Sequence, residues 1–208
     1  MNIIFVKQGN LYKSEHVNAL VKQLTPFCQN TRFICYTEDP SGLDIEHIPF
    51  IEKPTLRKWW NKLALFSSYF DEKVEGKCML FDLDVVVDRN PFDYVGGWDK
   101  LHVVDAYWKK ETYIPRHSYD TRINSSVLTW TSGTLNHIWQ HFISQRDYYM
   151  RKYKGIDGFI YNEDIDYGTH REGILSRVET PLPVAAVRSW NNINFNEIKG
   201  LQVTKTVV

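Results

Sequence analysis

The first half of the chain alternates short apolar runs with amphipathic segments. Residues 2–7 (NIIFVK) are apolar and end at Gln8-Gly9-Asn10, which predicts a buried strand followed by a loop. Ser14 is a suitable N-cap for a helix whose inner face holds Val17, Leu20, Val21 and Leu24. Residues 32–36 (RFICY) are β-branched and aromatic and precede a turn-forming segment. They predict a second strand, which completes a βαβ unit.

The pattern continues to residue 87. Residues 45–48 predict a short third strand, and a second helical face is marked by Trp59, Leu63, Phe66 and Phe70. Residues 78–87 (CMLFDLDVVV) are apolar on both faces, as a central parallel strand is. Strands that alternate with helices predict an open α/β sheet, in which ligands bind beyond the carboxyl ends of the strands.

The second half of the chain is patterned less regularly. A long helix is predicted over residues 134–152, with an inner face formed by Leu135, Ile138, Trp139 and Phe142. Other predicted features are strands near 101–106, 123–130 and 184–190, a loop beginning at 155–158 and a surface tail at 191–200. We find no repeat or linker that divides the chain, so residues 1–208 are predicted to form one domain.

Composition narrows the possible functions. The chain has 208 residues, of which 43% are hydrophobic, so it can bury a sizeable core. Its 25 basic and 25 acidic residues balance, which excludes the broad positive field of a nucleic-acid binder. Cys28, Cys35 and Cys78 form no paired motif and are expected to be reduced thiols. Because we find neither a signal peptide nor a membrane-length apolar run, we expect a cytoplasmic protein.

Asp82 and Asp84 interrupt the most apolar segment of the chain. Two carboxylates among apolar residues require cations, hydrogen-bond donors or a metal ion. In a regular strand, residues two apart point to the same face, so both carboxylates would address one site. Oxygen-only ligands suit Mg²⁺ or Mn²⁺, which commonly bridge to substrate phosphates. The alternative is that the strand ends at Leu83 and the aspartates cap a turn.

The ordered set of motifs resembles the GT-A fold glycosyltransferases. It is most similar to small bacterial and phage members related to the glycogenin and lipopolysaccharide galactosyltransferase group. The motifs cover most of the chain and occur in the family's order: IIFVKQGNLY, FICYTEDPSGLD, KWWNKLALF, FDLDVVV (the DxD motif), INSSVLTW and YNEDIDYG. The resemblance implies a GT-A, Rossmann-like open mixed sheet flanked by helices, with the DxD motif at the end of a central strand. It also implies a nucleotide-binding half, about 1–90, and an acceptor half, about 91–208.

The resemblance also implies which residues bind the nucleotide. In such enzymes the first strand and its loop contact the nucleotide, which here involves Lys7 and Tyr12. Thr37 follows the second strand and would lie near the uridine. Lys62 is expected to reach the donor phosphates or the sugar. The alternative is that it lies on a solvated helix face, as most lysines do. Trp60, from the same motif as Lys62, is a further substrate-binding candidate.

Other motifs correspond to the sugar side of the cleft in this family. Asn124 and Ser125 offer neutral donors and acceptors that suit sugar hydroxyls. Glu163 and Asp164 occupy the place of an Asp-Gln pair that contacts the donor sugar and the acceptor, so Glu163, Asp164 and Asn124 are the catalytic candidates. The family often closes the site with a Ser-Tyr-Lys or a His-containing motif. This chain instead has Arg188-Ser189-Trp190-Asn191, so Arg188 is the candidate cation.

The sequence therefore favours a hexosyltransferase-type enzyme. It would use Mn²⁺ or Mg²⁺ bound by Asp82 and Asp84 to transfer a sugar from a nucleotide-diphosphate donor, such as a UDP-sugar, to an acceptor hydroxyl on a glycan or another molecule. No nucleic acid or membrane span is expected.

Two rivals stay open. In one, FDLDVVV is the nucleophile strand of a haloacid-dehalogenase-like phosphatase, with Asp82 attacking phosphate. In the other, the chain binds sugar nucleotides or glycans without catalysis.

Overall fold

The structure is a computed structural model that describes residues 1–54, 56–109, 121–177 and 183–189. Its α-helices are α1 (Ser14–Leu24), α2 (Ser68–Asp71), α3 (Asn136–Ser144), α4 (Arg146–Lys152) and α5 (Ile156–Asn162). The 3₁₀ helices are η1 (Thr25–Phe27), η2 (Lys58–Phe66), η3 (Pro91–Tyr94) and η4 (Tyr107–Lys109). The predicted tail at 191–200 lies outside the described residues.

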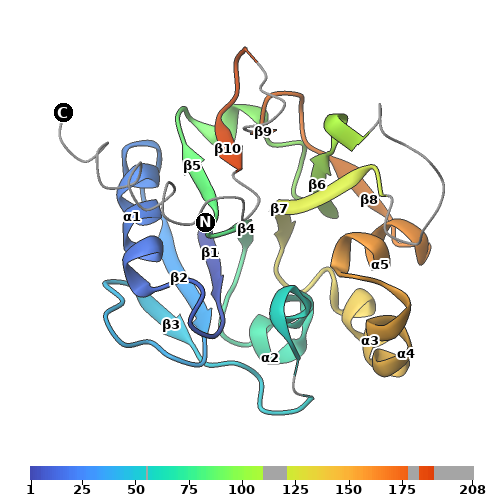
Figure 1. Ribbon diagram of the computed structural model, residues 1–208. Helices are drawn as coiled ribbons and strands as arrows, with labels where there is room; N and C mark the ends of the chain where they lie inside the picture. Colours follow the sequence, from blue (N-terminus) through green and yellow to red (C-terminus); the bar gives the residue numbers. More distant parts are fainter. Residues whose placement is uncertain (55, 110–120, 178–182, 190–208) are drawn as a thin grey trace.

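Two sheets organise these elements. The larger has the order β3 (Glu46–Ile48), β2 (Arg32–Thr37), β1 (Asn2–Lys7), β4 (Lys77–Phe81), β7 (Ile123–Thr131), β6 (Leu101–Asp105) and β8 (Tyr167–Thr169). Of these seven strands, β7 alone runs antiparallel to its neighbours. The smaller sheet has the order β5 (Val85–Val87), β10 (Val187–Ser189) and β9 (Leu175–Arg177). The expected mixed α/β sheet is confirmed (Figure 1).

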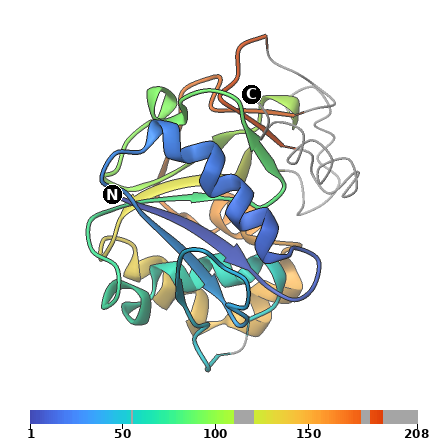
Figure 2. The same cartoon turned by 90° about the vertical axis from the view of Figure 1, so that its left-hand side faces the viewer.

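The central strands alternate their side chains between two cores. Ile4 and Leu80 face a core built with the helices of residues 58–71 and 136–162. Ile3, Phe5 and Met79 face the other core, which is built with α1 and the smaller sheet. Figure 2 shows α1 on one side of the large sheet and the helices of the first core on the other. The sheet is therefore covered on both faces, and its strand ends are the place where polar side chains can gather.

The predicted strand at 78–87 is wrong in its extent. β4 ends at Phe81, the chain turns at Leu83 and Asp84, and β5 then enters the smaller sheet. Leu83 is only 2% exposed and packs in the second core. Because both strands and the turn between them are buried, the apolar pattern runs on without a break, and periodicity cannot show the change of sheet.

Two helical predictions also need correction. The helix predicted at 134–152 is two helices, because the backbone departs from helical geometry at Gln145, between α3 and α4. The change of direction lets the ring of Tyr149 pack 5.0 Å from that of Phe159 in α5. The predicted loop at 155–158 holds the start of α5, whose inner face carries Ile156, Phe159 and Ile160.

The segment at 58–66 winds as a 3₁₀ helix instead of an α-helix. Trp59, predicted to face inward, is 39% exposed, whereas Trp60 is buried. A 3₁₀ helix has three residues per turn, so its inner face holds other residues than the face of an α-helix, which has 3.6 residues per turn. At α1, Ser14 is the first helical residue and Lys13 is the N-cap. The Ser14 hydroxyl donates to the Ser41 carbonyl, so it joins the helix to the loop after β2.

Candidate functional site

Polar side chains gather where β4 ends. Asp82 follows the last residue of β4, and its amide donates to the Ser126 carbonyl of β7 at 2.9 Å. The turn that follows holds Asp84, which is 6% exposed. The strand at this point lies in the middle of the large sheet. Both carboxylates therefore lie at the carboxyl end of a central strand, held by a turn and not by the regular strand geometry expected from sequence.

Lys62 connects η2 to this strand end. Its ammonium lies 2.6 Å from Asp82 Oδ1 and donates to the carbonyl and the hydroxyl of Ser125 at 3.0 and 3.3 Å. An ammonium has three N–H donors, and three acceptors surround this one. The side chain is 7% exposed. Lys58, one turn earlier, is exposed and lies over the Trp59 ring. Burial thus separates the two lysines of this motif.

Asp157 adds a second carboxylate to the cluster. Its Oδ1 accepts from the Ser125 amide at 3.1 Å, and its Oδ2 lies 3.6 Å from Lys109 Nζ. Ser125 therefore stands between Lys62 and Asp157. We call Asp82, Lys62, Ser125 and Asp157 the strand-end cluster. Sequence reasoning missed Asp157 because residues 155–158 were predicted as loop. The helical spacing of the apolar residues in α5 was the signal that could have placed it.

Tyr12 lies close to both aspartates of FDLDVVV. Burial is the largest cause that raises the pKa of its phenol, followed by the negative charges of Asp84 and then Asp82. Its ring packs edge-on against His16 of α1, with the centroids 5.9 Å apart. The phenol therefore stays neutral at physiological pH and keeps a hydroxyl donor in the field of the two carboxylates.

Lys7 and Thr37 lie opposite each other where β1 and β2 end. Both are buried, and both bind the turn at Asp39. The Lys7 ammonium donates to the Asp39 carbonyl at 2.8 Å, and the Thr37 hydroxyl accepts from the Asp39 amide at 3.1 Å. In this structure the two side chains shape the loop at the sheet edge.

Three other sequence-predicted residues do not belong to the strand-end cluster, although one of them, Asn124, is next to it in β7. Trp60 is buried in the core and stacks on Phe142 at 5.3 Å. The Asn124 side chain accepts from the Ser126 amide at 2.8 Å, beside the cluster. Arg188 of β10 forms an ion pair with Asp88 through two hydrogen bonds. These hydrogen bonds are the largest cause that raises the pKa of the Arg188 guanidinium. The structure thus gives Trp60 and Arg188 partners within the protein.

Glu163 and Asp164 also lie apart from this cluster. Glu163 binds the Lys152 ammonium at 2.7 Å and the Tyr153 hydroxyl, and its other oxygen lies 3.7 Å from His141 Nε2. Burial acts to raise the Glu163 pKa, but the hydrogen bonds from Lys152 and Tyr153 lower it overall. Asp164 is exposed, with a φ of 52°. The role predicted for this pair is not tested by these contacts.

The donor set at the end of β4 suits a hard divalent cation only in part. Within the described residues, no three His, Cys, Asp or Glu side chains gather closely enough to hold a metal ion by themselves. Asp82 and Asp84 supply carboxylate oxygens only. Mg²⁺ and Mn²⁺ are often bound by one or two carboxylates together with water and substrate phosphates. The residues therefore fit a cation that a diphosphate ligand helps to hold.

Comparison of sequences finds neither a matching family model nor a matching curated protein. Solved structures do match. The galactosyltransferase LgtC in complex with donor and acceptor sugar analogues aligns with a TM-score of 0.61 and 15% identity, over 100% of this chain and 97% of that one. A glycosyltransferase involved in glycosylation of the major capsid of PBCV-1 aligns with a TM-score of 0.63 and 12% identity, over 98% and 100%.

The glycosyltransferase GlyE of Streptococcus pneumoniae TIGR4 gives a TM-score of 0.67 at 12% identity, over 100% of this chain and 61% of that one. The mixed sheet flanked by helices is therefore the fold of GT-A type glycosyltransferases. At these identities the likeness establishes the fold. Among the described residues, no helix has the length and apolar character required to cross a membrane.

Proposed function

We propose that this protein is a glycosyltransferase that moves a sugar from a nucleoside-diphosphate donor, a UDP-sugar, to an acceptor hydroxyl. The observation that carries the proposal is the strand-end cluster. It joins Asp82, Lys62, Ser125 and Asp157 at the carboxyl end of the central strand in a GT-A fold. In open α/β sheets, this edge is where ligands bind.

The proposal includes a divalent cation, Mn²⁺ or Mg²⁺, held by Asp84 and Asp82. When bound, the cation would offset the negative charge that develops on the leaving diphosphate. Lys62 orients the Asp82 carboxylate by an ion pair of 2.6 Å and leaves its outer lone pairs for other ligands. The three N–H donors of the Lys62 ammonium already bind Asp82 and Ser125. We therefore assign Lys62 a positioning role instead of direct contact with phosphate.

Residues around the two aspartates supply the remaining contacts. The neutral Tyr12 phenol donates a hydrogen bond or stacks against the donor's base. Asp157 accepts one bond from the Ser125 amide and keeps further lone pairs for a sugar hydroxyl. Its side chain is 26% exposed, so it is accessible from solvent. We therefore place Asp157 on the sugar side of the site, with Asp84 on the diphosphate side.

Thermal unfolding with a panel of nucleotide sugars tests this proposal. A ligand at 100 times its Kd stabilises a protein by about 2.7 kcal/mol, which corresponds to roughly 5 to 10 °C for a domain of this size. We expect such a shift with a UDP-sugar plus Mn²⁺ and a much smaller one with either alone. If no nucleotide sugar shifts the transition in the presence of Mn²⁺ or Mg²⁺, the proposal is wrong.

The two rival functions predict different outcomes. A phosphatase that uses Asp82 as a nucleophile would release phosphate from p-nitrophenyl phosphate with Mg²⁺ and would be trapped by beryllium fluoride. The ion pair with Lys62 occupies one Asp82 oxygen, and the fold is that of glycosyltransferases, so we expect neither result. A non-catalytic binding protein would bind the UDP-sugar but neither hydrolyse it nor transfer the sugar.

A further inference from the structure

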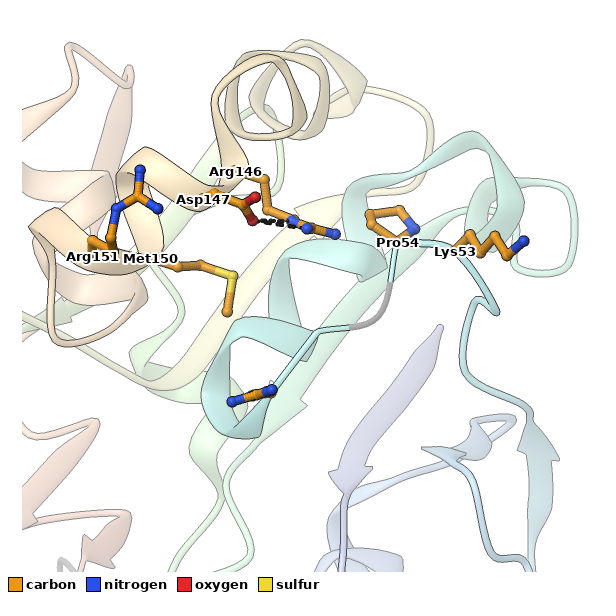
Figure 3. A pocket seen from close by; sticks show the side chains of 7 residues that line it. Lys53, Pro54, Arg146, Asp147, Met150 and Arg151 are labelled. Atoms are coloured by element: carbon orange, nitrogen blue, oxygen red, sulfur yellow. Dashed lines mark hydrogen bonds and ion pairs between the residues drawn. The ribbon is translucent and has the colours of Figure 1, made fainter.

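A basic cavity lies between the segment before η2 and helix α4. Its volume is about 840 Å³, and it is lined by Lys53, Pro54, Arg57, Arg146, Asp147, Met150 and Arg151. Figure 3 shows Arg146 and Asp147 of α4 paired with each other and lying opposite Pro54, with Arg151 further along the same helix. A cavity of this size is in the range that holds small-molecule ligands.

The charge of this cavity is strongly unbalanced. Its lining holds four cationic side chains and one carboxylate, in a chain whose formal net charge is zero. Asp147 is paired with Arg146 at 2.7 Å. In the part of the chain that the structure describes, Arg57 and Arg151 have no ion-pair partner. Like charges repel one another, so such a grouping is stabilised by an anion that binds between them.

The cavity continues into a second, smaller one. That neighbour has a volume of about 400 Å³, shares Pro54, Arg146 and Asp147 with the first, and reaches Tyr148, a residue that is 47% exposed. Gln145, at the break between α3 and α4, is among the residues that line this smaller cavity. The two cavities therefore form one groove, which has guanidinium groups along one part and an aromatic ring at the other.

We propose that this groove binds a phosphomonoester. A guanidinium presents a planar fork of donors that matches the oxygens of a phosphate, and a phosphomonoester carries a charge between −1 and −2 with three terminal oxygens. It can thus accept from several arginines at once, whereas a single carboxylate offers less charge and fewer oxygens. The length of the groove leaves room for the sugar that carries the phosphate.

The position of the groove indicates what the phosphomonoester belongs to. Arg57 precedes η2, and Lys62 follows five residues later, which is about 10 Å along a 3₁₀ helix. If the proposed function holds, a ligand in the groove lies a short saccharide away from the reacting centre. We therefore assign the phosphate to the acceptor, which would be a phosphorylated glycan.

Titration with glucose 6-phosphate, followed by NMR of the arginine side-chain N–H groups, tests the anion site without any activity assay. We expect saturable shifts at Arg57 and Arg151. The double variant Arg57→Gln/Arg151→Gln should weaken binding by about 10- to 100-fold, because two charge-assisted hydrogen bonds are lost. Lys22→Gln, which removes an exposed cation on α1, is the matched control and should leave the affinity unchanged. Equal binding by the double variant would overturn the proposal, as would equal affinity for glucuronate.

The acceptor assignment has its own test. With a UDP-sugar and Mn²⁺, phosphorylated glycans should accept sugar more efficiently than the same glycans after phosphatase treatment. Arg57→Gln/Arg151→Gln should raise the acceptor KM, with hydrolysis of the UDP-sugar unchanged. Preferential binding to phosphatidic acid vesicles would assign the phosphate to a lipid headgroup and overturn the acceptor assignment. If glucose 6-phosphate binds but no UDP-sugar does, the anion site stands and the proposed function fails.

Discussion

Two lysine–carboxylate pairs in this protein have nearly the same bond length and very different surroundings. Lys62 lies 2.6 Å from Asp82, and Lys152 lies 2.7 Å from Glu163. Lys62 is 7% exposed and also binds the backbone of β7, whereas Lys152 is 39% exposed and lies against tyrosine rings. The first pair stands at strand ends, and the second joins the ends of α4 and α5.

The difference between the pairs shows that contact distance alone does not identify a functional carboxylate. The Glu163 carboxylate contacts Lys152, Tyr153 and His141, and these contacts join three helices. Asp82 has one described cation, Lys62, and its negative charge also acts on the Tyr12 phenol. The strand ends are also where this fold leaves room for ligands. We therefore expect the Lys62–Asp82 pair to act in ligand binding or catalysis and the Lys152–Glu163 pair to stabilise the fold.

Loss of the Asp84 charge tests this comparison with the largest expected effect. Asp84→Asn keeps the shape of a side chain that is 6% exposed, but it removes the carboxylate that we place on the cation. We expect Mn²⁺-dependent binding of a UDP-sugar to weaken by about 100-fold or more, since a metal ligand is lost. Isothermal titration calorimetry measures this change.

Asp99→Asn is the matched control, because the Asp99 side chain is 79% exposed. It should bind the UDP-sugar as the wild type does. Unchanged Mn²⁺-dependent binding by a folded Asp84→Asn protein would contradict the metal assignment and leave the strand end without a cation.

Asp157→Asn tests the sugar side of the strand-end cluster. Asparagine can still accept from the Ser125 amide, so the fold should be retained, but the charge is lost. A charged hydrogen bond that strengthens in the transition state is worth about 2 to 4 kcal/mol, or roughly 30- to 1000-fold in rate. We expect kcat to fall by this factor, with little change in UDP affinity. Steady-state kinetics and UDP titration separate the two effects, and unchanged kcat would remove Asp157 from the site.

The sequence predicts strand positions well where an apolar run is followed directly by polar residues. The strand that ends at Lys7, the strand that precedes the turn at Asp39 and the start of the strand before Asp82 are predicted to within one residue, because each apolar run is bounded by polar or turn-forming residues. The single strand drawn through Asp84 was wrong, because buried turns and buried strands share the same apolar composition. Six strands of the large sheet could be read from the sequence, but its edge strand β8, the strand β9 and the transfer of the chain to a second sheet could not.

The candidate site was harder to predict because its contacts join distant segments. The sequence predicts Lys62 from one motif and its partner Ser125 from another, but their contact spans 63 positions and leaves no trace in either segment. Asp157 was missed because Gly155 and Gly158 suggested a loop. Gly158 in fact allows close packing, since a Cβ there would lie 3.1 Å from the Tyr153 ring. Sequence shows which residue types are present, and tertiary packing decides which of them meet.

The smallest effect on activity is expected at the Lys152–Glu163 pair. Glu163→Gln removes the charge that binds Lys152 and Tyr153, and we expect it to lower the free energy of unfolding at pH 7 by about 1.5 kcal/mol. We expect kcat to stay within a few-fold of wild type. A strong loss of kcat with intact UDP affinity would instead support the catalytic role suggested by the sequence and would erase the contrast between the two pairs. Urea unfolding and steady-state kinetics give the two measurements.

The pH dependence of that stability loss provides an independent check on Glu163. Its pKa in the folded protein lies below the ordinary value of 4.5, because hydrogen bonds from Lys152 and Tyr153 outweigh the effect of burial. A carboxyl with a lowered folded pKa stabilises the protein above pH 4.5, and this contribution disappears as pH falls through the folded pKa. The difference between wild type and Glu163→Gln should therefore be full at pH 6 to 7 and shrink in acid. The same measurement on Glu72→Gln, which changes an exposed carboxyl at the end of α2, is the matched control. A difference that stays constant into acid would show that the ionised carboxylate does not hold the helices together.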